Sequence, residues 1–113
     1  MHEISLLEQV RDILLEHSKS QRFTKVSQVT LEIGALSCVE EGALRFGFDV
    51  VMQGSLAENA KLTITYIDGL GFCQDCQQSV LMQSLHDPCV VCGSFGVKVV
   101  QGEEMRIKDL LVV

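Results

Sequence analysis

Four cysteines form two identical pairs with the spacing of a zinc ribbon. Two residues separate Cys73 from Cys76 and Cys89 from Cys92, and twelve residues lie between the pairs. Two residues between thiolates allow one tight turn to supply two ligands to a tetrahedral ion. Four thiolates fill the coordination sphere and leave no position for water or substrate, so the pattern predicts a structural Zn(II) site.

The alternative for a C-x-x-C pair is a redox dithiol, which normally occurs as one motif on a strand-to-helix turn. Two pairs at ribbon spacing favour zinc instead. The fifth cysteine, Cys38, is expected to pack as a small apolar residue. His86 lies in the loop between the pairs and is interpreted as a solvated loop histidine, with a role as an alternative metal ligand left open.

The first three residues offer a second set of metal donors. Methionine aminopeptidases generally require a small second residue, so His2 should preserve Met1. The amine of Met1, the amide nitrogen and imidazole of His2 and the amide of Glu3 form a flat, nitrogen-rich set. Such a set suits Ni(II) or Cu(II) and suits zinc poorly. The plain alternative is a frayed, solvent-exposed histidine.

Two helices are expected to support these donors. The S-x-x-E pattern of Ser5 and Glu8 predicts a helix with Ser5 as its cap, fading near residues 17–20. This start leaves His2 and Glu3 ahead of the helix in a short surface arm.

A second capping box, Ser37 to Glu40, predicts a largely buried helix over residues 38–53, with Gly54 as its C-terminal cap.

Strands are predicted over residues 25–33, 61–68, 96–101 and 105–113, where apolar and polar residues alternate. Gly69 and Gly71 are interpreted as a hinge. The pattern indicates an α+β fold, a small two-helix, three-stranded sheet domain with an inserted four-cysteine zinc-ribbon module. The domain boundaries expected are residues 1–70 plus 100–113 for the α/β domain and residues 71–99 for the ribbon.

Bulk composition excludes several classes of protein. The chain has 113 residues, 47% of them hydrophobic, and a formal net charge of −6. No apolar run is long enough to span a bilayer and no secretion signal is recognisable, so a cytoplasmic protein without a membrane role is expected. The negative charge disfavours binding to nucleic acid.

Several motifs occur in an order that resembles one family. They are Met1-His2-Glu3, a following Ser5, the segment E-I-G-A-L-S-C-V-E-E over residues 32–41, Phe46-Gly47-Phe48 and the two C-x-x-C pairs. Together they resemble the HypA/HybF family of nickel metallochaperones for hydrogenase maturation. The resemblance covers essentially the whole chain.

The resemblance implies a division of labour between two metals. It makes His2 the essential Ni(II) ligand, with Glu3 and backbone nitrogens from Met1 onward completing the nickel site, and it assigns the four cysteines to zinc. An acid at Glu40 or Glu41 is a further candidate to approach the nickel arm.

The implied partners are a HypB-type GTPase and the hydrogenase large subunit, and some family members also serve urease. A homodimer is left open.

Two other classes compete with nickel delivery. One is a zinc-ribbon adaptor that binds protein or nucleic acid without a second metal, and the other is a thiol oxidoreductase. The sequence contains no set of nucleophile, base and orienting group and no phosphate-binding glycine loop, so we expect no enzymatic activity.

Overall fold

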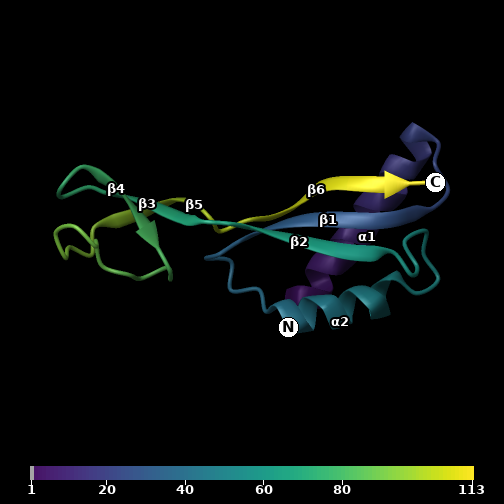
Figure 1. Ribbon diagram of the computed structural model, residues 1–113, viewed down its shortest axis with the longest axis horizontal. Helices are drawn as coiled ribbons and strands as arrows, with labels where there is room; N and C mark the ends of the chain where they lie inside the picture. The colour runs from purple at the N-terminus through teal and green to yellow at the C-terminus, as the bar shows by residue number, and fades with distance from the viewer. Residues whose placement is uncertain (1) are drawn as a thin grey trace. The chain divides into compact units, whose positions relative to one another are not determined.

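The computed structural model describes residues 2–113, with side chains from residue 3 onward. Its elements are α1 His2–Gln21, β1 Val26–Gly34, α2 Glu41–Met52, β2 Lys61–Ile67, β3 Gly69–Cys73, β4 Gln78–Met82, β5 Val97–Gln101 and β6 Met105–Val112 (Figure 1). One sheet has the order β2-β1-β6 and the other β4-β3-β5. This architecture confirms the predicted α+β fold class. Among the helices of residues 2–113, none is both long and apolar enough to cross a bilayer.

The chain divides into two compact units. Unit 1 comprises Met1–Leu31, Val39–Ile64 and Ile107–Val113, and unit 2 comprises Glu32–Cys38 and Thr65–Arg106. Unit 1 therefore contains both helices, and unit 2 contains all four paired cysteines. The sequence predicted a division by metal, with residues 1–70 plus 100–113 as the nickel-binding domain and residues 71–99 as the zinc ribbon. This functional division stays a prediction.

The core of unit 1 is formed by the apolar faces of both helices and of β1. Gly47 on α2 allows the helices to approach closely, because a Cβ atom there would lie 2.9 Å from the terminal methyl groups of Ile4 and Leu7. The buried apolar side chains of this core include Leu7, Val10, Leu14, Val26, Val29, Leu31, Leu44, Phe48 and Met52.

The helix α2 begins later, and is less buried, than the sequence predicted. Cys38 has a φ of +61°, a left-handed conformation that a helix cannot contain, so the helix starts at Glu41 with Glu40 as its cap. One face also remains open, because Phe46 is 74% and Val50 48% exposed. The helix also ends one residue earlier than predicted: Gln53 is its C-cap, and Gly54, the predicted cap, follows with a φ of +75°.

The second sheet contains two strands that the sequence did not reveal, β3 and β4. The expected hinge at Gly69 and Gly71 is wrong, because both residues belong to β3, which pairs antiparallel with β4 and with β5. Glycine at position 71 serves close packing, since a Cβ atom there would lie 2.4 Å from Val97 Cγ1 and 2.5 Å from Met82 Sδ.

The twelve residues between the cysteine pairs do not form a hairpin of their own. Instead β4 folds back on β3, with Cys73 opposite Gln78.

Candidate metal centres

The structure brings the four paired cysteines together. Their sulfur atoms all lie within 4.8 Å of one another. Sulfur–sulfur distances across the two pairs are 3.6 Å between Cys73 and Cys92 and 3.7 Å between Cys76 and Cys89. Four thiolates at about 2.3 Å from a tetrahedral zinc ion would lie about 3.8 Å apart. The donor set therefore fits a structural zinc site.

The two cysteine pairs lie on two separate turns of the same kind. The N–H of Gln77 donates to the carbonyl of Cys73 over 2.8 Å, and the N–H of Gly93 donates to the carbonyl of Cys89 over 2.8 Å. The residue after each pair is left-handed, with φ values of +61° at Gln77 and +76° at Gly93. We call these two turns, residues 73–77 and 89–93, the first and second knuckles.

Hydrogen bonds and burial shift the pKa values of two of the thiols in opposite directions. Backbone N–H groups of Cys92 and Val91 donate to the Cys89 sulfur, over 3.5 and 3.4 Å, and lower the pKa of Cys89 from 9.0 to about 7. Burial, followed by the neighbouring thiols, raises the pKa of Cys76 to about 12. Without metal, negative charge is therefore held more readily at Cys89 than at Cys76. Zinc binding displaces protons from thiols, so zinc affinity should rise with pH.

The predicted nickel arm lies only partly within the described residues. Met1 and the side chain of His2 fall outside them. The backbone of His2 already belongs to α1, so the prediction that the helix begins after Ser5 is wrong. Glu3 does not lie in a surface arm either, because it is only 8% exposed. Its carboxylate accepts a hydrogen bond from the N–H of Glu40 over 3.4 Å, and this contact helps to explain the early helix start.

The two further acids considered for the nickel arm have other interactions. The carboxylate of Glu40 accepts hydrogen bonds from the N–H groups of Gly42, at 3.0 Å, and of Ala43, and so caps α2. Glu41 pairs with Arg45 on the next turn over 3.0 Å, as expected from their spacing. Whether either acid approaches nickel stays a prediction.

Two further candidate residues, His86 and Cys38, both lie at the surface. His86 is exposed in the loop after β4, which agrees with a solvated loop histidine. Cys38 is exposed as well, so the expectation that it packs as an apolar residue is wrong. Its left-handed backbone follows the turn closed by the hydrogen bond from the N–H of Ser37 to the carbonyl of Gly34 and holds the side chain at the surface.

Sequence reasoning missed two residues beside the cysteines, Asp75 and Ser94. Ser94 donates a hydrogen bond from its hydroxyl to the Asp75 carboxylate. Their only signal in the sequence is position, because Asp75 lies inside the first pair and Ser94 two residues after the second. Aspartate and serine are also ordinary turn residues, so position alone could not identify them.

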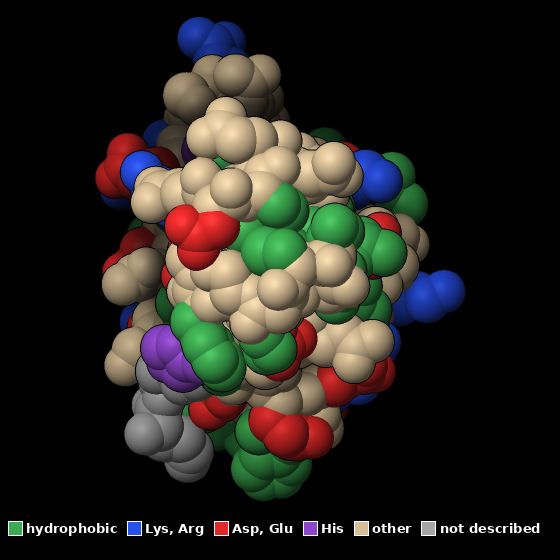
Figure 2. Space-filling model, turned by 90° about the vertical axis from the view of Figure 1, so that its left-hand side faces the viewer, with side chains coloured by type: hydrophobic (Ala, Val, Ile, Leu, Met, Phe, Trp, Pro, Cys, Tyr) green, Lys and Arg blue, Asp and Glu red, His purple; other side chains and the backbone are tan. Residues whose placement is uncertain are grey.

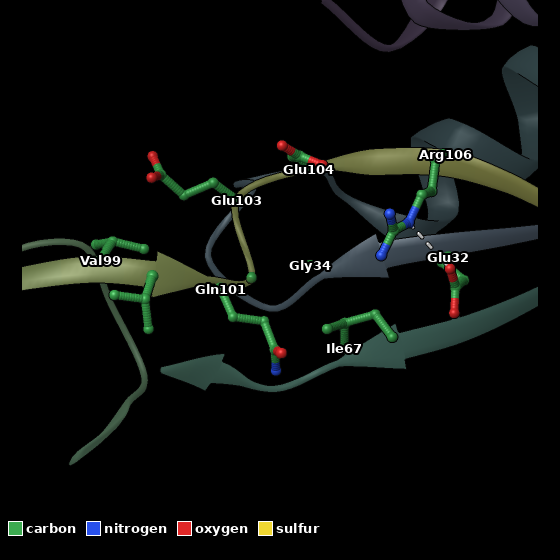
Figure 3. A pocket seen from close by; sticks show the side chains of 10 residues that line it. Glu32, Gly34, Ile67, Val99, Gln101, Glu103, Glu104 and Arg106 are labelled. Carbon is green, nitrogen blue, oxygen red and sulfur yellow. Dashed lines mark hydrogen bonds and ion pairs between the residues drawn. The ribbon is translucent and has the colours of Figure 1, made fainter. Parts of the chain in front are cut away.

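A cavity of about 420 Å³ lies within unit 2, away from the paired cysteines in sequence (Figure 3). The Arg106 guanidinium at its edge pairs with Glu32 over 3.1 Å. None of its lining residues is a cysteine or a histidine, so we assign the cavity no part in the two metal sites. The lining residues are Glu32, Gly34, Ile67, Val99, Val100, Gln101, Gly102, Glu103, Glu104 and Arg106.

An α+β chain with a closed four-cysteine centre on two knuckles defines a small metal-binding protein of the zinc-ribbon type. The chain belongs to the HypA family, whose model, described as hydrogenase/urease nickel incorporation, metallochaperone, matches residues 1–112.

Relatives support this membership along the whole length. The chain is 45% identical over 112 residues to the hydrogenase maturation factor HypA of Azotobacter chroococcum mcd 1 and 47% identical over 112 residues to that of Acidithiobacillus ferrooxidans, with 99% of both chains covered in each case. The solution structure of the Ni metallochaperone HypA from Helicobacter pylori matches with a TM-score of 0.74 and 28% identity, covering 100% of this chain and 98% of that one. The family resemblance is confirmed: the family is that of a nickel metallochaperone, and the four-cysteine cluster of this chain fits a structural zinc site.

Proposed function

We propose that this protein binds Ni(II) through Met1, His2 and Glu3 and delivers it to a [NiFe]-hydrogenase during maturation. Zinc at Cys73, Cys76, Cys89 and Cys92 is structural in this proposal. The observation that supports it best is family membership over residues 1–112, which includes both the N-terminal arm and the ribbon.

The helix start supports nickel binding at the N-terminus. The helix α1 begins at His2. In any helix, the N–H groups of the first turn have no acceptor within the helix itself. The positive end of the helix dipole favours the deprotonated forms of the amide nitrogens of His2 and Glu3. With the Met1 amine and the His2 imidazole, they complete a nitrogen-rich set of the kind Ni(II) accepts.

Glu3 has a distinct part in this proposal. Its carboxylate is buried and holds the N–H of Glu40, so we assign its amide nitrogen, not its carboxylate, to the metal. The carboxylate then fixes the start of α1 against the start of α2, within unit 1. The proposed functional division follows: residues 1–70 plus 100–113 form the nickel-binding part, and residues 71–99 form the zinc ribbon.

The proposal extends to partners by way of the family. A HypB-type GTPase supplies the nucleotide energy for insertion, and the hydrogenase large subunit receives nickel; urease is a second client, and a homodimer a candidate assembly. The protein itself is a carrier, not an enzyme. We place it in the cytoplasm, where thiols stay reduced and available to zinc. The net charge of −6 argues against a nucleic-acid partner.

One observation favours the alternative of a zinc-ribbon adaptor without nickel delivery. The second knuckle exposes Val90 by 74% and Val91 by 60%, and the nearby Phe95 is 79% exposed. Figure 2 shows hydrophobic side chains on the face of the molecule that it presents. Exposed apolar residues of this kind often mark protein contacts. The two functions differ in nickel binding, which an adaptor lacks.

The deciding experiment measures nickel in the intact protein by native mass spectrometry and isothermal titration. The parent should retain Met1, carry one zinc and bind nickel. His2→Gln should lose nickel binding while keeping Met1 and zinc, because it removes the imidazole from the chelate and the large second residue still preserves Met1.

His86→Gln is the matched control, since it removes an exposed histidine between the knuckles, and it should bind nickel like the parent. Equal nickel binding by His2→Gln and the parent would exclude delivery through this arm. A purified chain with free thiols and no zinc would instead revive the thiol oxidoreductase.

A further inference from the structure

The two knuckles come from separate stretches of chain, and one residue contacts both. The Ser94 carbonyl accepts a hydrogen bond from the N–H of Cys89 over 2.7 Å, which ties it to the second knuckle. The Ser94 hydroxyl donates to the carboxylate of Asp75, which lies between the two cysteines of the first knuckle. Ser94 thus connects the two halves of the metal site without being a ligand.

Neighbouring contacts hold this connection in place. The oxygen of the Ser94 hydroxyl accepts a hydrogen bond from the N–H of Gly96 over 2.9 Å. The hydroxyl proton therefore remains available to donate to the Asp75 carboxylate. The carbonyl of Gly96 accepts from the N–H of Gln74 over 3.1 Å, which joins the first knuckle to the segment after the second. A Cβ atom at Gly96 would lie 3.0 Å from the Asp75 carboxylate, so glycine leaves the room that the pair occupies.

We propose that Asp75 and Ser94 form a clamp that positions the two knuckles and slows the release of zinc. Apart from this clamp, the described contacts between the first knuckle and the segment after the second knuckle are the β3–β5 pairing and the Gln74–Gly96 hydrogen bond. The clamp keeps the sulfurs of opposite knuckles at the 3.6 and 3.7 Å spacing that a zinc ion requires. This inference rests on the proposed zinc site, and it assigns Asp75 and Ser94 a positioning role, not a ligating one.

The same module contains a second serine–aspartate pair that serves as a matched control. The Ser84 hydroxyl donates to the Asp87 carboxylate, which also accepts from the N–H groups of Gln83 and Ser84 over 2.9 and 3.0 Å. These hydrogen bonds close the loop after β4 within itself and join no cysteine to another. The chemistry is alike in the two pairs, and only the Asp75–Ser94 pair connects the knuckles.

The test is the rate at which the zinc-loaded protein transfers its metal to an excess of a coloured chelator. Hydrogen-bond partners that support metal ligands typically change metal affinity by 10- to 100-fold. Ser94→Ala should therefore release zinc at least about tenfold faster than the parent. Ser94→Thr keeps the hydroxyl and should release zinc at nearly the parent rate, as should Ser84→Ala.

Two further readouts separate positioning from a general loss of structure. In the cobalt(II)-substituted protein, Ser94→Ala should alter the visible absorption bands, which report the geometry of the four thiolates, while helical circular dichroism stays unchanged. The double variant Asp75→Ala/Ser94→Ala should release zinc no faster than the faster single variant, because both remove the same contact.

Different failures have different meanings. A parent without zinc would refute the zinc site of the proposed function, and the clamp with it. A parent that holds one zinc, with Ser94→Ala and Ser84→Ala equally slow to release it, would refute the clamp alone. Strictly additive effects in the double variant would also overturn it.

Discussion

The residue after each cysteine pair shows how one backbone angle shapes the site. Gln77 and Gly93 occupy equivalent places, donate equivalent hydrogen bonds and both have a positive φ. For a residue with a Cβ atom this conformation costs about 1–2 kcal/mol, whereas glycine adopts it freely. The first knuckle therefore carries strain that the second one avoids.

This difference predicts opposite effects of two substitutions. Gln77→Gly should raise the free energy of unfolding of the zinc-loaded protein by about 1 kcal/mol, and Gly93→Ala should lower it by about 1 kcal/mol. Nothing lies within 4 Å of a Cβ atom at Gly93, so its change reports backbone conformation alone. Urea unfolding measures both values. A shift of both variants in the same direction would show that backbone angle is not the cause.

At the scale of the element, the close approach of the helices depends on Gly47. An alanine Cβ there would lie 2.9 Å from both Ile4 and Leu7, whereas at Gly42, in the first turn of α2, its nearest neighbour is the exposed Glu40 carboxylate at 3.2 Å. Both substitutions bring the same gain in helix propensity. Gly47→Ala should nevertheless be less stable than Gly42→Ala by about 1–3 kcal/mol, because it overpacks the α1–α2 contact.

Denaturation followed by helical circular dichroism tests this comparison. Equal stability of the two variants would mean that α1 and α2 adjust without cost. The result also concerns nickel, since Ile4 lies next to the proposed donor Glu3.

The elements that could be predicted are those with a local signal. The alternation of Val29, Leu31 and Ile33 predicted β1 within one residue at each end. The strand β3 was missed because glycines at positions 69 and 71 remove the apolar alternation, although the close approach of neighbouring strands requires them.

The start of α1 was misplaced for a different reason. The contact that buries Glu3 comes from Glu40, 37 residues away, and no local pattern can indicate such a partner. The cysteine spacing, in contrast, was sufficient to predict which four sulfurs come together. The Asp75–Ser94 contact could not be predicted from the sequence, because it depends on how the two knuckles face each other.

At the scale of the whole molecule, the two units differ in what stabilises them. Unit 1 has a core built from two helices and a sheet. In unit 2, Ile33, Leu36 and Met82 are buried as well, but the cluster around the cysteines is small: Cys73, Val80 and Cys89, with Cys76 and Val97 packed against it. A cluster of this size provides little hydrophobic stabilisation, so the metal has to supply the rest.

Removal of zinc should therefore act locally. A chelator with a reductant should abolish the dispersed amide resonances of residues 69–101 in NMR spectra, while helical circular dichroism is largely retained because α1 and α2 belong to unit 1. The Cys38→Ser variant, which removes an exposed cysteine outside the centre, should still hold one zinc. Loss of helix in parallel with zinc would show that unit 1 depends on the metal as well.

The contacts between sulfurs have a consequence for damage by oxidants. The 3.6 and 3.7 Å contacts join Cys73 to Cys92 and Cys76 to Cys89, each from one knuckle to the other. When peroxide oxidises these thiols and the metal is lost, disulfides between these neighbouring cysteines would cross-link the two knuckles. A redox enzyme instead closes a disulfide within one C-x-x-C motif. Oxidation of this protein would thus leave a cross-linked ribbon that resembles the zinc-bound one but cannot bind zinc. Only a reductant could restore zinc binding.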